Sequence, residues 1–331
     1  MTLHLNGIGH FHPENEITNR FLEDLEIDTN DEWIIERVGI RSRRTVLPLE
    51  YIRETHNADP RAAMEAALHS NAEMGRRAAE FAISRAGIAK SDIGMVIAGT
   101  SATDWASPAE ACTIAAELEL EVPAFDIISA CTSFYTQLYA LSLMQPEKLP
   151  DYVLLVVPES LTKTVNYSDR AAAVLWGDGA AAAVVSTRHR GRACIIGNTL
   201  DSSPAGWDKV FVPRTGHFEQ EGRTVQTFGI KRMTRCLAAL KEEFSVDTRR
   251  FHFIGHQANQ RMLETVCKRC EIPADRHHTN VEWFGNTGCA SSASVVSMNW
   301  EKWQQLDDIA LVGVGSGLTW SSYLIRFGAG A

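Results

Sequence analysis

The feature that most constrains the fold is a pattern of elements that occurs once in each half of the chain. In each half, a predicted helix is followed by an apolar strand and then by a turn that carries a cysteine: residues 71–86, 95–99 and Cys131 in the first half, and residues 230–244, 251–255 and 286–289 in the second. The repeat lies in this order of elements and not in the letters. The sequence therefore predicts an α/β protein of two βαβ-type halves, packed face to face, with the loop ends of both halves at one central site.

The expected boundary between the halves is a polar, arginine-rich link near residues 186–192, which follows a predicted strand over residues 180–185. We therefore predict an N-terminal half over residues 1–188 and a C-terminal half over residues 189–331. The chain has 331 residues, 45% of them hydrophobic, which is enough for two packed subdomains.

Cys131 lies where a predicted strand gives way to a predicted helix. The apolar run 125–128 ends in the small residues Ser129 and Ala130, and the helix continues to Leu143. Unpaired backbone N–H groups at a helix N-terminus stabilise a thiolate and lower the pKa of the cysteine. Cys131 is therefore a candidate nucleophile. The alternative is a small buried core residue, since most free cysteines are of that kind.

A histidine and an asparagine occupy similar turns. His256 follows the apolar strand 251–255, and a residue at the carboxyl end of a strand is well placed for ligand chemistry. Asn286 lies in a turn before a helix rich in small residues. Each alone is more often structural, as a core histidine or a turn residue. Together with Cys131 they supply a thiolate, an imidazole and an amide donor, a set that suits acyl transfer through a thioester.

These residues resemble a known family. Cys131, His256 in His-Gln-Ala-Asn and Asn286 in Gly-Asn-Thr-Gly look like the triad of the β-ketoacyl-acyl-carrier-protein synthase III enzymes, in the thiolase superfamily. Three further segments match the family's coenzyme-A-contacting segment, its Gly-Asp-Gly-Ala motif and its C-terminal glycine loop: residues 31–43, 176–181 and 315–320. The resemblance covers nearly the whole chain. It implies the thiolase fold, two duplicated α/β halves in a layered α-β-α-β-α architecture, and a homodimer.

The resemblance also implies a two-stage reaction that needs no metal or redox cofactor. An acyl-CoA primer loads its acyl group onto Cys131, and the backbone N–H groups of Cys131 and Ser316 stabilise the oxyanion. A malonyl thioester, expected on acyl carrier protein, then loses carbon dioxide while His256 and Asn286 donate hydrogen bonds to its thioester oxygen. The carbanion attacks the acyl group on Cys131 and gives a β-ketoacyl thioester, for fatty-acid or secondary-metabolite biosynthesis.

Aromatic and basic residues are expected to bind the two carriers. By resemblance, Trp33 stacks on the adenine of coenzyme A, Arg37 and Arg170 lie near its phosphates, and Arg261 belongs to the same binding set. Carrier proteins are acidic, so a basic docking patch is expected as well. The candidates for this patch are Arg37, Arg41, Arg43, Lys231, Arg232 and Arg261.

Departures from the family pattern bear on the substrate. Ser133 replaces a glycine two residues after the cysteine, and Val314 precedes the glycine loop where the family has Phe. Ser107 stands near the wall of the primer tunnel, where the family often carries a bulky Phe, although Trp105 is close by. We therefore expect Ser107 and Val314 to line a wider tunnel that takes primers longer than acetyl. The segment 47–69 is longer than in housekeeping members and is expected to cover the tunnel or the dimer seam, or to be a surface elaboration.

Composition excludes several other classes of protein. The net charge of −9 argues against a nucleic-acid partner, and no apolar run approaches the roughly 18 residues of a membrane span. Seven cysteines, an odd number, point to a reducing compartment, and residues 1–10 lack a signal-peptide pattern. We therefore expect a cytoplasmic protein. Cys267 and Cys270 have the spacing of a metal or redox pair, but no second ligand pair accompanies them.

Two alternatives to the condensing enzyme remain at this point. An acyltransferase of the same fold would move the acyl group from Cys131 to an oxygen or nitrogen without malonate. A non-catalytic subunit of a heterodimer would need no nucleophile. The presence of both His256 and Asn286 favours condensation, because decarboxylation needs that donor pair. The presence of Cys131 as well argues against a non-catalytic subunit.

Overall fold

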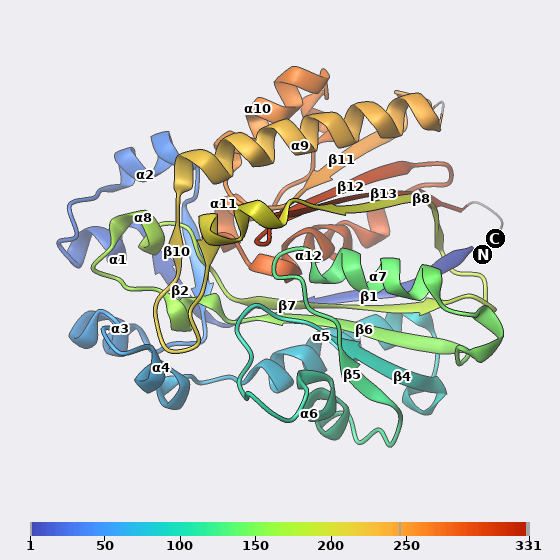
Figure 1. The fold of residues 1–331 in the computed structure, drawn as a ribbon, viewed down its shortest axis with the longest axis horizontal. Helices are drawn as coiled ribbons and strands as arrows, with labels where there is room; N and C mark the ends of the chain where they lie inside the picture. The colour runs from blue at the N-terminus through green and yellow to red at the C-terminus, as the bar shows by residue number, and fades with distance from the viewer. Residues whose placement is uncertain (1, 245, 329–331) are drawn as a thin grey trace.

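The computed structural model describes residues 2–244 and 246–328 and has five layers (Figure 1). One sheet of nine strands runs through it, in the order β11-β12-β13-β8-β1-β7-β6-β4-β5. The strands in that order are β11 (Phe251–Gly255), β12 (Asp308–Gly315), β13 (Thr319–Phe327), β8 (Ala193–Ser202), β1 (Leu3–Phe11), β7 (Gly179–Ser186), β6 (Tyr152–Glu159), β4 (Ile93–Ala98) and β5 (Ala124–Asp126). The C-terminal strands meet the N-terminal ones only at β8 and β1, where Leu3, His4 and Leu5 pair with Ile195, Cys194 and Ala193.

Helices cover both outer faces and fill the space between the two half-sheets. The outer helices are α5 (Asn71–Ala86) and α6 (Glu110–Glu117) on one side and α9 (Gly222–Glu243) and α10 (Gln260–Cys270) on the other. The central layer consists of α7 (Ser133–Leu143) and α12 (Ser291–Met298) (Figure 1). Small side chains let α12 lie between the two half-sheets, and every residue from Ser291 to Ser297 is buried. The layered α-β-α-β-α architecture is therefore confirmed.

Shorter elements gather at the end of the sheet where the catalytic loops lie (Figure 1). They are α1 (Asn19–Asp24), α2 (Asp31–Arg37), α3 (Leu49–Thr55), α4 (Pro60–Ala66), α8 (Arg170–Ala173), α11 (Val281–Phe284), the pair β2 (Asn15–Thr18) and β3 (Ser42–Thr45), and the pair β9 (Val210–Phe211) and β10 (Glu219–Gln220). Single 3₁₀ turns occur at Lys90–Asp92, Pro146–Lys148, Leu161–Thr164, Pro204–Lys209, Ala274–Arg276, Gly288–Ala290 and Trp300–Lys302.

The predicted strands and helices lie within two residues of their expected bounds, except for one helix that is longer than expected. The predicted helix 230–244 belongs to α9, which already begins at Gly222. Gly222 and Gly229 weaken the local preference for a helix. Packing overrides that preference, because a Cβ placed on Gly229 would lie 3.2 Å from the sulfur of Met262 on α10. A side chain at position 229 would require Met262 to shift by a few tenths of an ångström, so glycine suits this approach of the two helices.

The proposed boundary between the halves coincides with a loop, since β7 ends at Ser186 and β8 begins at Ala193. The segment 47–69 forms two short helices, α3 and α4. Within the described residues, none of the helices combines the length and apolar character needed to cross a membrane.

Candidate active site

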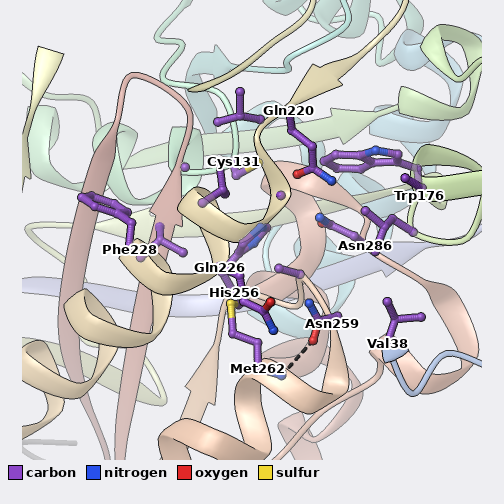
Figure 2. Close-up of a pocket in the computed structure, with 18 of the residues that line it drawn as sticks. Val38, Cys131, Trp176, Gln220, Gln226, Phe228, His256, Asn259, Met262 and Asn286 are labelled. Atoms are coloured by element: carbon purple, nitrogen blue, oxygen red, sulfur yellow. Dashed lines mark hydrogen bonds between the residues drawn. The ribbon is translucent and has the colours of Figure 1, made fainter. Parts of the chain in front are cut away.

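A cavity of about 380 Å³ lies where loops of the two halves meet, and Cys131, His256 and Asn286 all line it (Figure 2). Trp176 and Gln220 lie on one side of Cys131 and Phe228 lies on the other. The structure therefore brings the three predicted catalytic residues together from three separate loops.

The turn that carries Cys131 is closed by the serine that replaces the family's glycine. The Ser133 hydroxyl donates to the Ala130 carbonyl at 2.7 Å and accepts from the Ser129 N–H at 3.0 Å. Ala130 has a φ of 50°, a conformation that costs a non-glycine residue free energy. The hydroxyl of Ser133 thus holds a strained turn immediately before the first turn of α7.

The protonation state of Cys131 differs from the expected one. Burial, together with the negative charge of Glu159, raises the pKa of Cys131 to about 12. The expectation that the helix N-terminus lowers this pKa is therefore wrong for the free protein. Desolvation of the thiolate is the larger effect, and Cys131 is a thiol at neutral pH.

His256 is held by backbone and side-chain contacts at the end of β11. The backbone N–H of His256 donates to the Val312 carbonyl at 2.8 Å, and the ring atom Nδ1 lies 3.0 Å from Oγ of Ser291. The side chain is buried, and burial lowers its pKa to about 4. His256 is therefore a neutral imidazole at pH 7, able to accept a proton.

Asn286 is fixed at both its backbone and its side chain. Its backbone N–H donates to the Leu175 carbonyl at 2.8 Å, and its backbone carbonyl accepts from the Gly177 N–H at 3.1 Å. Its side-chain Oδ1 accepts from the Gly288 N–H at 3.0 Å. Because Oδ1 is occupied by this bond, the Nδ2 group is the part of the amide that remains to donate to a ligand.

The Gly-Asp-Gly-Ala motif supports the backbone contacts of Asn286 with Leu175 and Gly177. A Cβ on Gly177 would lie 2.0 Å from the Phe284 carbonyl oxygen, so no side chain fits there. The buried carboxylate of Asp178 accepts from the backbone N–H groups of Val46 at 2.8 Å and Thr162 at 2.9 Å. The motif therefore ties the Asn286 turn to the N-terminal half.

The glycine loop lies against the nucleophile. A Cβ on Gly315 would be 3.3 Å from Cβ of Cys131. Ser316 lines the cavity, and its carbonyl accepts from the Thr319 hydroxyl at 3.1 Å. The Thr319 hydroxyl also lies 2.7 Å from that of Thr132, so the loop and the cysteine turn are joined directly.

The four expected coenzyme-A residues have different surroundings. Trp33 and Arg37 line the cavity, with the Arg37 guanidinium 5.8 Å from the centre of the Trp33 ring. The Arg170 guanidinium lies 4.9 Å from the centre of the same ring, and its Nη1 lies 2.7 Å from the carboxylate of Asp28. Arg261 instead donates to the Ile35 carbonyl at 2.9 and 3.1 Å, a contact that joins α10 to α2.

The prediction that Arg43 belongs to a docking patch is wrong. Arg43 is fully buried, and its guanidinium donates to the Val174 carbonyl and to the side chain of Asn19. Such a side chain cannot meet a partner protein. The sequence could not show this, because Arg43 lies among exposed arginines and its burial depends on packing against α8. Arg41 is exposed but pairs with Glu282 at 2.6 Å.

The two expected tunnel residues lie in different cavities of the single chain. Val314 lines the cavity of Cys131, whereas Ser107 and Trp105 line a second cavity of about 600 Å³. Arg61 and Met64 of α4, within the segment 47–69, also line this second cavity.

Sequence reasoning missed two residues beside the triad, Ser291 and Glu159. Ser291 was hidden among similar small residues. Glu159 ends the apolar strand β6, and an acidic residue at that position is a signal that could have been noticed. Among the described residues, no group of three or more His, Cys, Asp or Glu side chains is placed to hold a metal ion.

Comparison with known proteins agrees with this geometry. The chain is 32% identical to β-ketoacyl-[acyl-carrier-protein] synthase III of Oceanobacillus iheyensis, over 99% of this chain and 100% of that one. This chain belongs to the β-ketoacyl-acyl-carrier-protein synthase III family. The sequence model of 3-oxoacyl-[acyl-carrier-protein] synthase III matches residues 125–204, and the model of its C-terminal part matches residues 250–327.

Other members of the synthase III family are also similar over nearly the whole length of this chain. The Chlamydia caviae enzyme is 32% identical, over 96% of this chain and 95% of its own. The crystal structure of the synthase III from Aquifex aeolicus superposes with a TM-score of 0.87 at 27% identity, over 98% of this chain and 100% of that one.

Proposed function

We propose that this synthase III family member is a Claisen condensing enzyme that uses Cys131 as its nucleophile. An acyl-CoA primer transfers its acyl group to the Cys131 sulfur and releases coenzyme A as a thiol. A malonyl thioester, expected on acyl carrier protein, then loses carbon dioxide. Its carbanion attacks the acyl group, the carbon–sulfur bond to Cys131 breaks, and a β-ketoacyl thioester leaves.

In the loading step, the neutral imidazole of His256 accepts the thiol proton of Cys131. This assignment is supported by the opposite pKa shifts of the two groups, which leave a thiol beside an unprotonated base. The backbone N–H groups of Cys131 and Ser316 stabilise the oxyanion. The proton then passes to the departing coenzyme A sulfur, which returns His256 to its neutral form.

In the condensation step His256 is the tautomer that carries its proton on Nε2, with Nδ1 accepting from the Ser291 hydroxyl. Nε2 of His256 and Nδ2 of Asn286 then donate hydrogen bonds to the thioester oxygen of malonate as it gains enolate charge. The observation that carries the proposal is the bond from the Gly288 N–H to Oδ1 of Asn286 at 3.0 Å. It leaves the amide nitrogen as the group available to the substrate. A plain acyltransferase needs no such donor pair.

The same proposal covers the carriers and the assembly. Trp33 and Arg37 bind the nucleotide end of coenzyme A at the mouth of the cavity, with Arg170 and Arg261 close behind them. The enzyme acts as a homodimer, and Ser107 and Val314 leave room for a primer longer than acetyl.

Intact-mass spectrometry and product analysis test the function. Purified protein is incubated with a panel of acyl-CoA thioesters, and then with malonyl-acyl carrier protein. We expect one acyl group on Cys131, followed by release of carbon dioxide and a β-ketoacyl thioester. Transfer of the acyl group to an alcohol or amine without malonate would identify an acyltransferase instead, and failure of every thioester to load would indicate a non-catalytic subunit.

A further inference from the structure

Glu159 is a buried carboxylate at the junction of the two halves, and four groups donate to it. Its Oε1 accepts from the Thr100 hydroxyl and the Ser101 N–H, both at 2.9 Å. Its Oε2 accepts from the Ser101 hydroxyl at 2.9 Å and from the Cys289 N–H at 3.1 Å. The first three donors follow β4 in the N-terminal half, whereas Cys289 belongs to the turn after Asn286. The carboxylate therefore joins the loops of both halves.

The contact with Cys289 is next to the contact that orients Asn286. The Gly288 N–H holds Oδ1 of Asn286, and the following N–H, that of Cys289, is held by Glu159. Gly288 has a φ of 52°, and a Cβ there would lie 2.3 Å from Oε2 of Glu159. The turn is thus pressed against the carboxylate, and its two successive N–H groups point to Asn286 and to Glu159.

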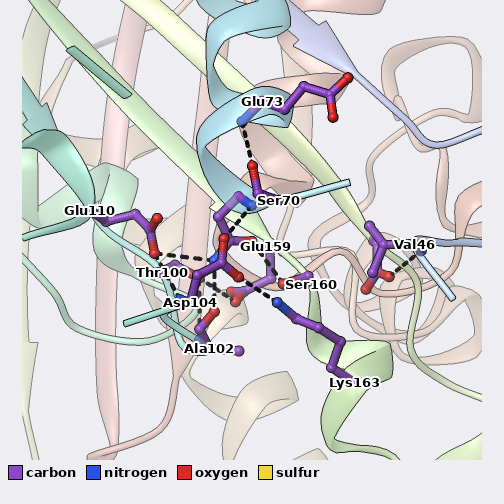
Figure 3. Close-up of polar contacts among 12 residues, drawn as sticks. Val46, Ser70, Glu73, Thr100, Ala102, Asp104, Glu110, Glu159, Ser160 and Lys163 are labelled. Carbon is purple, nitrogen blue, oxygen red and sulfur yellow. Dashed lines mark hydrogen bonds and ion pairs between the residues drawn. The ribbon is translucent and has the colours of Figure 1, made fainter. Parts of the chain in front are cut away.

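The network extends from Glu159 to the loop over the second cavity. Figure 3 shows Asp104 between Glu110 and Lys163, close to Glu159 and Thr100. Asp104 forms an ion pair with the buried Lys163, and its N–H donates to Glu110 at 3.1 Å. The Thr100 hydroxyl that donates to Glu159 accepts from the Ala102 N–H at 3.2 Å, and Asn71 donates both to the Ala102 carbonyl and to Glu110. Glu159 is therefore joined to a buried network of paired groups, which favours one arrangement.

We propose that Glu159 is a positioning residue for the decarboxylation step, which it serves by holding the 286–289 turn so that the Asn286 amide nitrogen faces the malonyl thioester. The proposal rests on the proposed function, in which Asn286 is an enolate donor. Glu159 does not touch the substrate. Its negative charge also acts on the nucleophile, since it is one of the two causes that raise the pKa of Cys131. A change of charge and a change of length at this residue should therefore have different effects.

Two variants separate these effects. Glu159→Asp keeps the charge but shortens the side chain by one methylene, so the Cys289 N–H loses its partner. We expect hexanoyl-CoA loading within about threefold of wild type and a fall of about tenfold or more in carbon dioxide release from malonyl-acyl carrier protein, since one lost bond to a charged group is worth about 1.5–3 kcal/mol. Glu159→Gln removes the charge, so alkylation of Cys131 by iodoacetamide should begin at lower pH, whereas in Glu159→Asp its pH profile should stay near that of wild type.

Glu110→Gln is the matched control, because it removes a carboxylate of the same network that does not contact the 286–289 turn. It should leave both the ratio of loading to decarboxylation and the alkylation profile unchanged. Thermal unfolding of each variant checks that it is folded. If Glu159→Gln does not fold, Glu159→Asp alone tests the positioning role of Glu159. Loss of loading and decarboxylation by the same factor in Glu159→Asp, or no loss of either, would overturn the inference.

Asn286→Ala, measured alongside, distinguishes this failure from a failure of the proposed function. If Asn286→Ala decarboxylates normally, the donor role of Asn286 in the proposed function is wrong. If Asn286→Ala loses decarboxylation while Glu159→Asp retains it, only the role of Glu159 is wrong.

Discussion

The Nδ1 atom of His256 lies 3.0 Å from the hydroxyl oxygen of Ser291, the first residue of α12. The same hydroxyl lies 3.4 Å from the N–H of Gln257, so it is itself held in place. The contact fixes the rotation of a buried imidazole and leaves its Nε2 atom for the cavity. The central helix of the fold therefore sets the orientation of the proposed catalytic imidazole, which directly follows β11.

The first prediction concerns this contact. Ser291→Ala should lower kcat about fivefold with little change in KM, because a lost hydrogen bond of about 1 kcal/mol lets the ring of His256 rotate. Ser292→Ala is the control, since that hydroxyl donates to the Gly255 carbonyl at 3.2 Å and not to the imidazole. Steady-state kinetics of the two variants checks the prediction. An equal loss of activity in both would mean that packing of α12, rather than the contact with His256, is responsible.

The second prediction assigns the acylation site. Cys131→Ala should abolish acyl loading, whereas Cys289→Ala should still load. Cys289 is buried, and its sulfur lies 3.4 Å from the Gly99 carbonyl oxygen, away from the cavity lining. Burial raises its pKa well above the ordinary value, so it remains a thiol. Intact-mass spectrometry after incubation with acyl-CoA measures the adduct, and a persistent adduct on Cys131→Ala would refute the assignment.

The third prediction tests the amide nitrogen of Asn286 as a hydrogen-bond donor separately from the amide oxygen, which holds the turn. Asn286→Asp keeps an oxygen to accept from the Gly288 N–H but removes the amide donor. We expect acyl loading to continue and decarboxylation to fall by about 10²–10³-fold, the usual cost of one oxyanion-type donor. Release of carbon dioxide from malonyl-acyl carrier protein is the measurement. Unchanged release would show that Asn286 is not the donor to the enolate.

The sequence predicted those parts of the site that depend on local pattern. Cys131, His256 and Asn286 each follow a recognisable run of residues, and α5 and β11 have the expected bounds. Properties that depend on burial could not be predicted in this way.

Arg43 and Cys131 illustrate this limit. The letters around Arg43 are those of an exposed basic segment, yet packing encloses its guanidinium and lowers its pKa to about 9. The thiol of Cys131 has a helix N-terminus beside it, as predicted, but desolvation has the larger effect on its pKa. Both outcomes depend on neighbours that are distant in the sequence.

The fourth prediction is a loss of stability in acid. Burial lowers the pKa of several histidines from the ordinary value of 6.5, to about 3 for His12 and about 4 for His10, His256, His277 and His278. The unfolded chain binds these protons below about pH 6.5, whereas the folded protein does not until about pH 4. The free energy of unfolding should therefore fall as pH drops through this range.

Asp178 acts in the opposite direction, because burial raises its pKa from 3.8 to about 6 and the folded protein then binds its proton more readily. One such carboxyl offsets only part of the effect of several histidines, since each tenfold change in the proton affinity of a group is worth about 1.4 kcal/mol. Urea unfolding at pH 7.5 and pH 5, at constant ionic strength, measures the net change. Equal midpoints at the two pH values would show that these imidazoles are not buried in solution.

The last prediction concerns primer length and uses the two residues that lie in different cavities. We expect the wild type to prefer primers of about six carbons or more to acetyl-CoA, since each buried methylene contributes about 0.8 kcal/mol. Val314→Phe places a ring in the cavity of Cys131 and should shift the preference towards short primers in any assembly state. Ser107→Phe faces the second cavity of its own chain, so it should shorten the preferred primer only if the partner subunit delivers the ring to the tunnel.

Competition between acyl-CoA thioesters, read by intact mass, measures this preference for both variants, and size-exclusion chromatography reports their assembly state. A wild type that prefers acetyl-CoA would contradict the wide tunnel. A preference for short primers in Val314→Phe but not in dimeric Ser107→Phe would confine the tunnel to one subunit, and Trp105 would then be the side chain that closes the space beside Ser107.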